Sequence, residues 1–389
     1  MIGAVALSAD PSTAGRVAGM PVALRAALLL QAAGCERVEL WGPGGEAWRA
    51  ALVADDRVRV PVTVGGAEEG PRLALSDRFA LDLAAVRALL AAPAALEHDG
   101  ELVAVHATAG EGDALRRRGE PLLGAGDWLC APARDEPERR AATRALLQRL
   151  RKPQDGVVSR RLNRALSLAV TARLCETSLR PNQLSVGILA FGAAAAALAA
   201  QGTHATLALA GLLFQTQSVL DGCDGELARL SFRGSRLGEW IDTVGDDLTN
   251  YGYFAGAALG LHAAGLGVAP LVVGGVGLGA GLLASGIEYV YLARIGSGDL
   301  LKYPLGFGKD AGVTDEALSA QRGLRGLAGA LRPMFKRDFF VFAAMLCAFA
   351  GMTATFVMLC AFAVGAAVTL VAVLRSEWAR RGLAPGAEP

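Results

Sequence analysis

The sequence lacks three features that would place it at once in a large class of proteins. Its formal net charge is only +1, so no bulk positive field would hold a nucleic acid, and we expect no nucleic-acid partner. Its six cysteines form no C-x-x-C pair, which argues against a zinc site or a disulfide framework. The first residues lack the basic start of a signal peptide, so we expect the amino-terminal half to stay in the cytoplasm.

Charge is also missing from long stretches of the second half. Residues 181–220 and 339–374 contain no Lys, Arg, Asp or Glu. Other apolar stretches fall at 240–262 and 267–292, each near the roughly 20 residues that a membrane helix needs. Residues 181–220 are long enough for two spans, and 339–374 is expected to fold back near Gly351. The sequence therefore predicts an all-α domain of six transmembrane helices over 181–380.

Basic residues indicate the orientation of these spans. Lys and Arg gather before residue 181, at 229–236, at 294–337 and at 375–381, and the turns between these groups have none. By the positive-inside rule each basic group is cytoplasmic. We therefore predict a multi-pass protein of the cell (cytoplasmic) membrane with both termini in the cytoplasm.

The first half predicts a different architecture. Short β-type runs such as 2–8 and 37–42 alternate with helical patterns at 21–34 and 80–93, which indicates an α/β domain over 1–150 with a largely parallel sheet. Residues 151–180 follow as a linker in which basic residues alternate with Leu, Val and Ala at helical spacing. This pattern fits an amphipathic helix in the membrane interface, and a solvated linker helix is the alternative.

Two acidic pairs follow the first long uncharged stretch. Asp221 and Asp224 are three residues apart, and Asp242 and Asp246 are four apart, so each pair lies on one face of a helix. Two neighbouring helices can then direct four carboxylates into one space, where their repulsion calls for a cation. An oxygen shell without His or Cys selects a hard ion such as Mg²⁺ (or Mn²⁺, or Ca²⁺).

The residues around the acidic pairs suit a phosphate-bearing substrate. Gly225 and Ala228 leave their helix face free of bulk, Arg229 offers a fork of donors to a phosphate, and Gly238 would let the second and third spans approach closely. Asp247 points about 100° away from its neighbour on a helix, so we expect a supporting or surface acid there.

The combined pattern resembles the signature of the CDP-alcohol phosphotransferase (CDP-alcohol phosphatidyltransferase) family. The matching positions are Asp221, Asp224, Gly225, Ala228, Arg229, Gly238, Asp242 and Asp246. The resemblance covers about 155–375 and implies a six-span fold, a homodimer and a site for two metal ions. It also implies a reaction in which an acceptor hydroxyl attacks the β-phosphate of a CDP-alcohol donor and CMP leaves. CDP-diacylglycerol and a CDP-inositol-like donor both fit.

The resemblance and the chemistry of the residues suggest roles. Asp221, Asp224 and Asp242 are expected to ligate metal. Asp246 either bridges the ions or takes the acceptor's proton, and we favour the general base. Pro181 and Asn182 resemble the family's segment near the cytidine.

The basic segment 294–337 includes Lys302, Lys336 and Arg337. These residues could hold an acceptor that itself carries a phosphate. Anchoring by the positive-inside rule explains the same residues equally well.

Residues 1–150 resemble the sugar-phosphate nucleotidyltransferases, with Asp77 as the match to their metal-binding aspartate. The family's glycine-rich, arginine-containing phosphate loop is missing, and Gly19 and Met20 stand before Pro21 where a lysine is expected. We therefore expect an inactive, nucleotidyltransferase-like domain. Its fusion to the membrane domain resembles the bifunctional inositol-phosphate cytidylyltransferase/phosphotransferases.

Two alternatives remain open beside a metal-dependent transferase of phospholipid or phosphodiester biosynthesis. In one, the amino-terminal domain also makes the CDP-alcohol from CTP. In the other, the chain is a metal or ion transporter, because acids within a membrane are functional by default. A transporter would more naturally place them near the midplane, whereas these acids lie at helix ends beside arginines.

Overall fold

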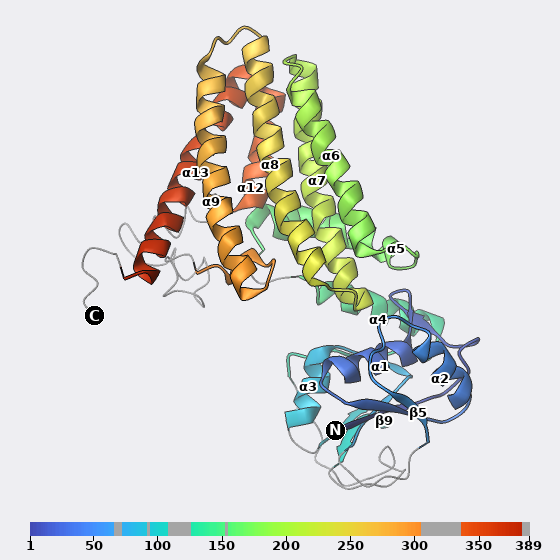
Figure 1. Cartoon of the computed structure of the whole chain (residues 1–389). Helices are drawn as coiled ribbons and strands as arrows, with labels where there is room; N and C mark the ends of the chain where they lie inside the picture. Colours follow the sequence, from blue (N-terminus) through green and yellow to red (C-terminus); the bar gives the residue numbers. More distant parts are fainter. Residues whose placement is uncertain (66–71, 92–93, 108–125, 152–154, 305–335, 383–389) are drawn as a thin grey trace. The chain divides into compact units, whose positions relative to one another are not determined.

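The computed structural model describes the chain except residues 66–71, 92–93, 108–125, 152–154, 305–335 and 383–389 (Figure 1). The chain divides into two compact units. The first comprises Met1–Leu150, Thr171–Ser178 and Arg229–Arg233, and the second comprises Arg151–Val170, Leu179–Ala228 and Gly234–Pro389.

The first unit is an α/β unit around a mixed sheet. The strand order is β5 (Val62–Val64), β4 (Arg37–Trp41), β1 (Ile2–Ala6), β6 (Arg72–Ser76), β9 (Glu101–Ala107) and β8 (Ala94–His98). Strand β1 is parallel to β4 and β6, and β4 to β5, but β9 is antiparallel to both β6 and β8. A two-residue turn causes the reversal, because Asp99 and Gly100 both have positive φ, at 51° and 76°, as a tight hairpin requires. The prediction of a largely parallel sheet is wrong on this side.

Helices α1 (Val22–Ala32), α2 (Gly45–Val53), α3 (Leu83–Ala91) and α4 (Glu136–Gln148) complete this unit, with two small ribbons, β2 (Arg16–Val17) with β3 (Met20–Pro21) and β7 (Phe79–Leu81) with β10 (Cys130–Pro132). The helices predicted within 21–34 and 80–93 are confirmed. Helix α1 forms because its leucines can leave water together, and Leu28 and Leu30 are almost fully buried in the core.

The second unit is helical. It contains a π-helical turn (Ser159–Asn163), α5 (Arg164–Leu174), α6 (Pro181–Ala199), α7 (His204–Ser231), α8 (Arg236–Ala263), α9 (Ala269–Ile295), a 3₁₀ turn (Leu300–Lys302), α12 (Arg337–Ala350) and α13 (Met352–Arg380), with the ends of α5 and α7 assigned to the first unit. Among the described residues, α6, α9 and α13 are long and apolar enough to cross a membrane. Helices α7 and α8 carry the acidic pairs, and α12 has 14 residues, fewer than the roughly 20 of a full span. Membrane association follows from these apolar helices.

Glycines bring α6 and α8 close together. A Cβ on Gly256 or Gly260 of α8 would overlap the carbonyl oxygen of Ala196 or Ala199 of α6. Small residues permit this backbone approach, which is how helices pack in an apolar solvent. The seam packs the carboxyl-terminal part of α8 against the carboxyl-terminal part of α6.

Aromatic rings join further helices to this pair. Phe214 of α7 stacks on Tyr253 of α8 with ring centroids 4.3 Å apart, and Phe254 stacks on Phe362 of α13 at 4.2 Å. Such pairs add stabilisation beyond the area that they bury. The rings on α7 and α8 lie about two helical turns from Asp221 along α7 and from Asp246 along α8.

The predicted fold-back near Gly351 is confirmed. Helix α12 ends at Ala350 and α13 begins at Met352, with φ of Gly351 at 119°. Only glycine adopts this backbone angle without strain. The uncharged stretch 339–374 therefore divides into parts of two helices.

Candidate active site

The four aspartates lie on facing turns of α7 and α8. Ser235 begins α8, because its hydroxyl accepts the backbone N–H of Gly238 at 3.0 Å and so satisfies a helix-end donor. A small hollow of about 10 Å³ adjoins the acids, which is room for about one water molecule or ion. It is lined by Ser185, Ile188, Leu189, Gln217, Asp221, Asp224, Ile241, Asp242 and Gly245.

Asp224 is the most buried of the four acids. Only 6% of the residue is exposed. The hydroxyl of Ser185 on α6 donates to Oδ2, and the backbone N–H of Gly225 donates to Oδ1 at 2.6 Å. Ser185 therefore orients Asp224 toward the hollow. Ser185 lies one turn after Pro181 and so on the same helix face, a spacing that would have indicated it from the sequence.

Arg337 lies between Asp221 and Asp246, one aspartate from each acidic pair. Its Nη1 donates to Asp221 Oδ2 at 2.9 Å, and its Nη2 lies 2.8 Å from Asp246 Oδ1. The Arg337 guanidinium also donates hydrogen bonds to the side-chain amide oxygens of Gln217, at 3.2 Å, and Asn250, at 3.4 Å. Gln217 precedes Asp221 by one turn of α7, and Asn250 follows Asp246 by one turn of α8. A spacing of four residues from an aspartate is therefore the sequence pattern that indicates both Gln217 and Asn250.

These contacts allow a test of whether the residues suit a metal ion. The donor set is carboxylate oxygen, the chemistry that hard divalent cations prefer. A cation does lie between Asp221 and Asp246, in the form of the Arg337 guanidinium. Within the described part of the chain, no three His, Cys, Asp or Glu side chains are arranged as they would be around a metal. The residues therefore fit a cation by charge and donor type, while their present arrangement holds a guanidinium.

The predicted cytidine positions lie at the start of α6, and the predicted phosphate positions lie on the last turns of α7 and, for Gly238, at the start of α8. A Cβ on Gly238 would lie 3.3 Å from Oδ1 of Asn182, so the close approach at Gly238 is between α8 and α6. The expectation that it brings the second and third spans together is wrong in this respect. Pro181 is buried as the first residue of α6.

The predicted basic residues are dispersed. Lys302 donates from Nζ to Ser297 Oγ at 2.9 Å, and Ser297 in turn donates to Glu239. Lys336 precedes α12 as its cap. Arg229 is exposed on the last turn of α7 and belongs to the first contact unit. Of the basic residues predicted to bind substrate, Arg337 contacts Asp221 and Asp246.

Asp247 faces away from the cluster, as the helical angle predicted. Its Oδ2 accepts a hydrogen bond from the Tyr289 hydroxyl of α9 at 2.7 Å. Asp247 is therefore a matched neighbour against which the role of Asp246 can be compared.

The first unit carries a separate cavity at the carboxyl ends of β1 and β6. Its volume is about 160 Å³, and its lining includes Ser8, Thr13, Gly15, Asp77, Arg78, Arg134 and Arg139. Asp77 Oδ2 accepts the backbone N–H of Ser8 at 3.0 Å. Burial is the main cause that raises the pKa of Asp77 above its usual range.

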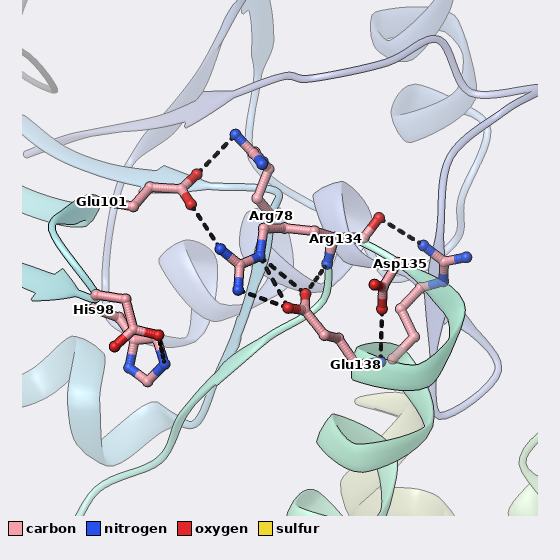
Figure 2. A network of polar contacts seen from close by, with 8 residues as sticks. Arg78, His98, Glu101, Arg134, Asp135 and Glu138 are labelled. Carbon is pink, nitrogen blue, oxygen red and sulfur yellow. Dashed lines mark hydrogen bonds and ion pairs between the residues drawn. The ribbon is translucent and has the colours of Figure 1, made fainter.

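The arginines at this cavity are already paired within the unit. Figure 2 shows Arg134 between Glu138, at 2.6 Å, and Glu101, at 3.3 Å, with Arg78 on the other oxygen of Glu101 at 2.9 Å. Arg139 pairs with Glu136. Each of these three arginines thus has at least one carboxylate partner in the same unit.

Comparison with known proteins finds a family match within the helical unit. Residues 178–302 match the CDP-alcohol phosphatidyltransferase family. This segment contains both acidic pairs, Ser185 and the start of α6. The match therefore falls on the part of the chain that builds the hollow.

Named relatives match about a third of this chain. A "Bifunctional IPC transferase and DIPP synthase" of Thermococcus kodakarensis is 39% identical over 123 residues, which is 31% of this chain and 27% of that protein. Proteins of the same name from Archaeoglobus fulgidus and Aquifex aeolicus are 34% and 37% identical, over 34% and 28% of this chain and 26% and 24% of theirs. The matched segment thus spans about a quarter of the length of these relatives.

Proposed function

We propose that the chain is an integral membrane CDP-alcohol phosphotransferase. It would transfer the phosphoalcohol group of a CDP-alcohol to an acceptor hydroxyl and release CMP. The observation that carries this proposal is the hollow between α7 and α8, where Asp221, Asp224 and Asp242 meet, inside the segment that matches the phosphatidyltransferase family. The relatives' names, which contain "transferase" and "synthase", point the same way.

The aspartates would hold divalent cations, Mg²⁺ or Mn²⁺, and two ions would share the four carboxylates. Bound there, the ions would neutralise the charge that develops on the pyrophosphate. Ser185 keeps Asp224 oriented, and Asp246 would accept the proton of the attacking hydroxyl. Gly225, Ala228 and Gly238 would leave room for the CDP group. Pro181 and Asn182 would border the cytidine, and Arg229 would donate to a phosphate.

The acceptor is proposed to be an alcohol that can carry its own phosphate. Arg337 supports this proposal, because its guanidinium is the basic group that contacts Asp221 and Asp246 directly. Lys302 and Lys336 remain candidates for the same role. Their described positions equally suit anchoring at the membrane surface.

We further propose the domain arrangement that the sequence predicts. Residues 1–150 would be a cytoplasmic domain and residues 151–180 the linker with its interfacial helix. Residues 181–380 would form the six-span membrane domain, with both termini cytoplasmic and the chain a homodimer. The glycine seam between α6 and α8 supports packing within a bilayer.

CMP release tests the proposed reaction. The full chain in proteoliposomes would be given Mg²⁺, CDP-diacylglycerol or CDP-inositol, and free or phosphorylated inositol and glycerol. One pair should release CMP in step with formation of the phosphodiester. A transporter would instead move ⁵⁴Mn²⁺ across the liposome membrane without releasing CMP, and that result would replace the proposal.

The first unit is proposed to transfer no nucleotide. Gly19, with φ at 72°, and Met20, buried at 3% exposure, stand where a lysine would be needed. The rim arginines are paired with Glu101 and Glu138. The alternative, that this unit makes the CDP-alcohol, is favoured by the cavity at Asp77 and by the word "bifunctional" in the relatives' names. Release of pyrophosphate when the full chain receives CTP, Mg²⁺ and an inositol or glycerol phosphate would establish that alternative.

A further inference from the structure

The two terminal nitrogens of the Arg337 guanidinium contact two different aspartates. One terminal nitrogen is bound to Asp221 on α7 and the other lies against Asp246 on α8, at 2.9 and 2.8 Å. A planar guanidinium can bridge two carboxylates in this way, whereas a lysine ammonium offers a single point of charge. The contact therefore ties the two acidic helices together through one side chain.

The remaining two acids are arranged differently. Asp224 is held by Ser185 and by the backbone of Gly225, and Asp242 lines the hollow beside it. Asp221 also lines this ion-sized space, so it lies between the hollow that it shares with Asp224 and Asp242 and the Arg337 guanidinium. An ion that also used Asp221 and Asp246 would compete with the guanidinium for the same oxygens.

We propose that Arg337 is a tethered counter-ion that occupies Asp221 and Asp246 until a divalent cation displaces it. This inference rests on the proposed function, because the displaced guanidinium becomes the donor that meets the acceptor's phosphate. Binding of the metal and the Arg337 contact exclude one another, so each weakens the other by the same factor. The enzyme would acquire its acceptor-binding group only when its metal is in place.

The backbone around Arg337 supports a swing of the side chain alone. The next residue, Asp338, accepts the backbone N–H of Ser159 at 2.6 Å, which fixes the first turn of α12. Arg337 is the first residue of that helix. Its long side chain can therefore leave the carboxylates by changing rotamer while α12 stays in place.

Manganese titration of the metal-free full chain in detergent tests the displacement. Free Mn²⁺ would be followed by electron paramagnetic resonance for the wild type, Arg337→Gln and Arg337→Lys. Arg337→Gln removes the guanidinium that competes with the ion, so its affinity for Mn²⁺ should rise about ten- to a hundredfold. This factor corresponds to the loss of one charged hydrogen bond. Arg337→Lys should lie between Arg337→Gln and the wild type. Arg375→Gln, which removes an exposed positive charge from α13, should bind as the wild type does.

Thermal unfolding with and without Mn²⁺ distinguishes a change in metal affinity from a loss of stability in the variant. Arg337→Gln should unfold at lower temperature than the wild type in EDTA, because its carboxylates repel, and should gain more from Mn²⁺. If it does not fold in EDTA, Arg337→Lys serves, with a smaller gain in affinity expected. Equal or weaker Mn²⁺ binding in both variants overturns the displacement while leaving the metal site intact. Failure of the wild type to bind Mn²⁺ at all overturns the metal site and this inference together.

Discussion

Arg164 and Glu226 form a buried ion pair, with Nη1 of the arginine 2.6 Å from Oε1 of the glutamate. Ser167 donates to the same oxygen at 2.8 Å, and Asp155 holds the other side of the guanidinium. Glu226 is fully buried two residues after Asp224. The first turn of α5 is thereby fixed to the acidic end of α7. Arg164, which lies in the segment 151–180 predicted to hold an interfacial helix, is therefore paired inside the helical unit.

Loss of this pair should destabilise the helical unit. Glu226→Gln leaves Arg164 buried with one carboxylate fewer, and breaking a buried pair typically costs about 3–5 kcal/mol. Because Asp155 remains, we expect about 3 kcal/mol, measured by thermal unfolding in detergent. Arg381→Gln, which removes an exposed pair with Glu377, should change stability by less than about 0.5 kcal/mol. Similar effects from both changes would mean that the buried pair stabilises no more than a surface one.

Asp246→Asn should separate catalysis from binding. The amide keeps the size of the side chain and one ligand oxygen but accepts no proton, so kcat should fall about 10²–10⁴-fold, while Mn²⁺ binding weakens much less than in Asp221→Asn. Asp221→Asn should weaken Mn²⁺ binding itself. Asp247→Asn, beside it but bound to Tyr289, should keep kcat within a few-fold. If Asp246→Asn loses Mn²⁺ as Asp221→Asn does, then Asp246 is chiefly a ligand and the base lies elsewhere.

Arg337→Gln should affect the two substrates unequally. The loss of one charged hydrogen bond to the acceptor's phosphate is worth about 1.5–3 kcal/mol, or roughly ten- to a hundredfold. We therefore expect the acceptor KM to rise by that factor at saturating Mg²⁺, with little change in the CDP-alcohol KM. Steady-state kinetics with each substrate varied in turn would measure this. Equal changes in both KM values would favour the anchoring interpretation.

The arginine network of the first unit should give an acid-dependent stability. The side-chain hydrogen bonds from Arg134 are the largest cause that lowers the pKa of Glu138 from 4.5 to about 2. A depressed carboxyl pKa stabilises the fold above the unfolded value and loses this contribution as pH falls through the folded value. The stability difference between the wild type and Glu138→Gln should therefore shrink between pH 4.5 and pH 2.

Thermal unfolding across this range would measure the effect, and added salt should reduce it. Arg134→Gln is the matched variant, because it removes the partner and should abolish the same pH dependence. A difference between wild type and Glu138→Gln that stays constant down to pH 2 would contradict the assignment.

Features that depend on residues close in sequence could be predicted from the spacing of residue types. The helix at 22–32, the break at Gly351 and the facing of Asp247 away from Asp246 all follow from local spacing and from glycine's backbone freedom. The antiparallel β9 follows from the Asp99-Gly100 turn, which is a two-residue hairpin signal in the sequence. Arg337 lies far along the chain from Asp221, and no local pattern could predict that its guanidinium would lie between Asp221 and Asp246. Ser185, Gln217 and Asn250 were within reach of helical spacing.

Magnesium-dependent release of CMP by the full chain in proteoliposomes tests the central claim most directly. With its CDP-alcohol and acceptor, the wild type should release CMP in Mg²⁺ and stop in EDTA. Asp242→Asn, which removes a carboxylate that lines the hollow, should lower the rate at least about a hundredfold. CMP release that is unaffected by EDTA, or that persists at the wild-type rate in Asp242→Asn, would contradict the account.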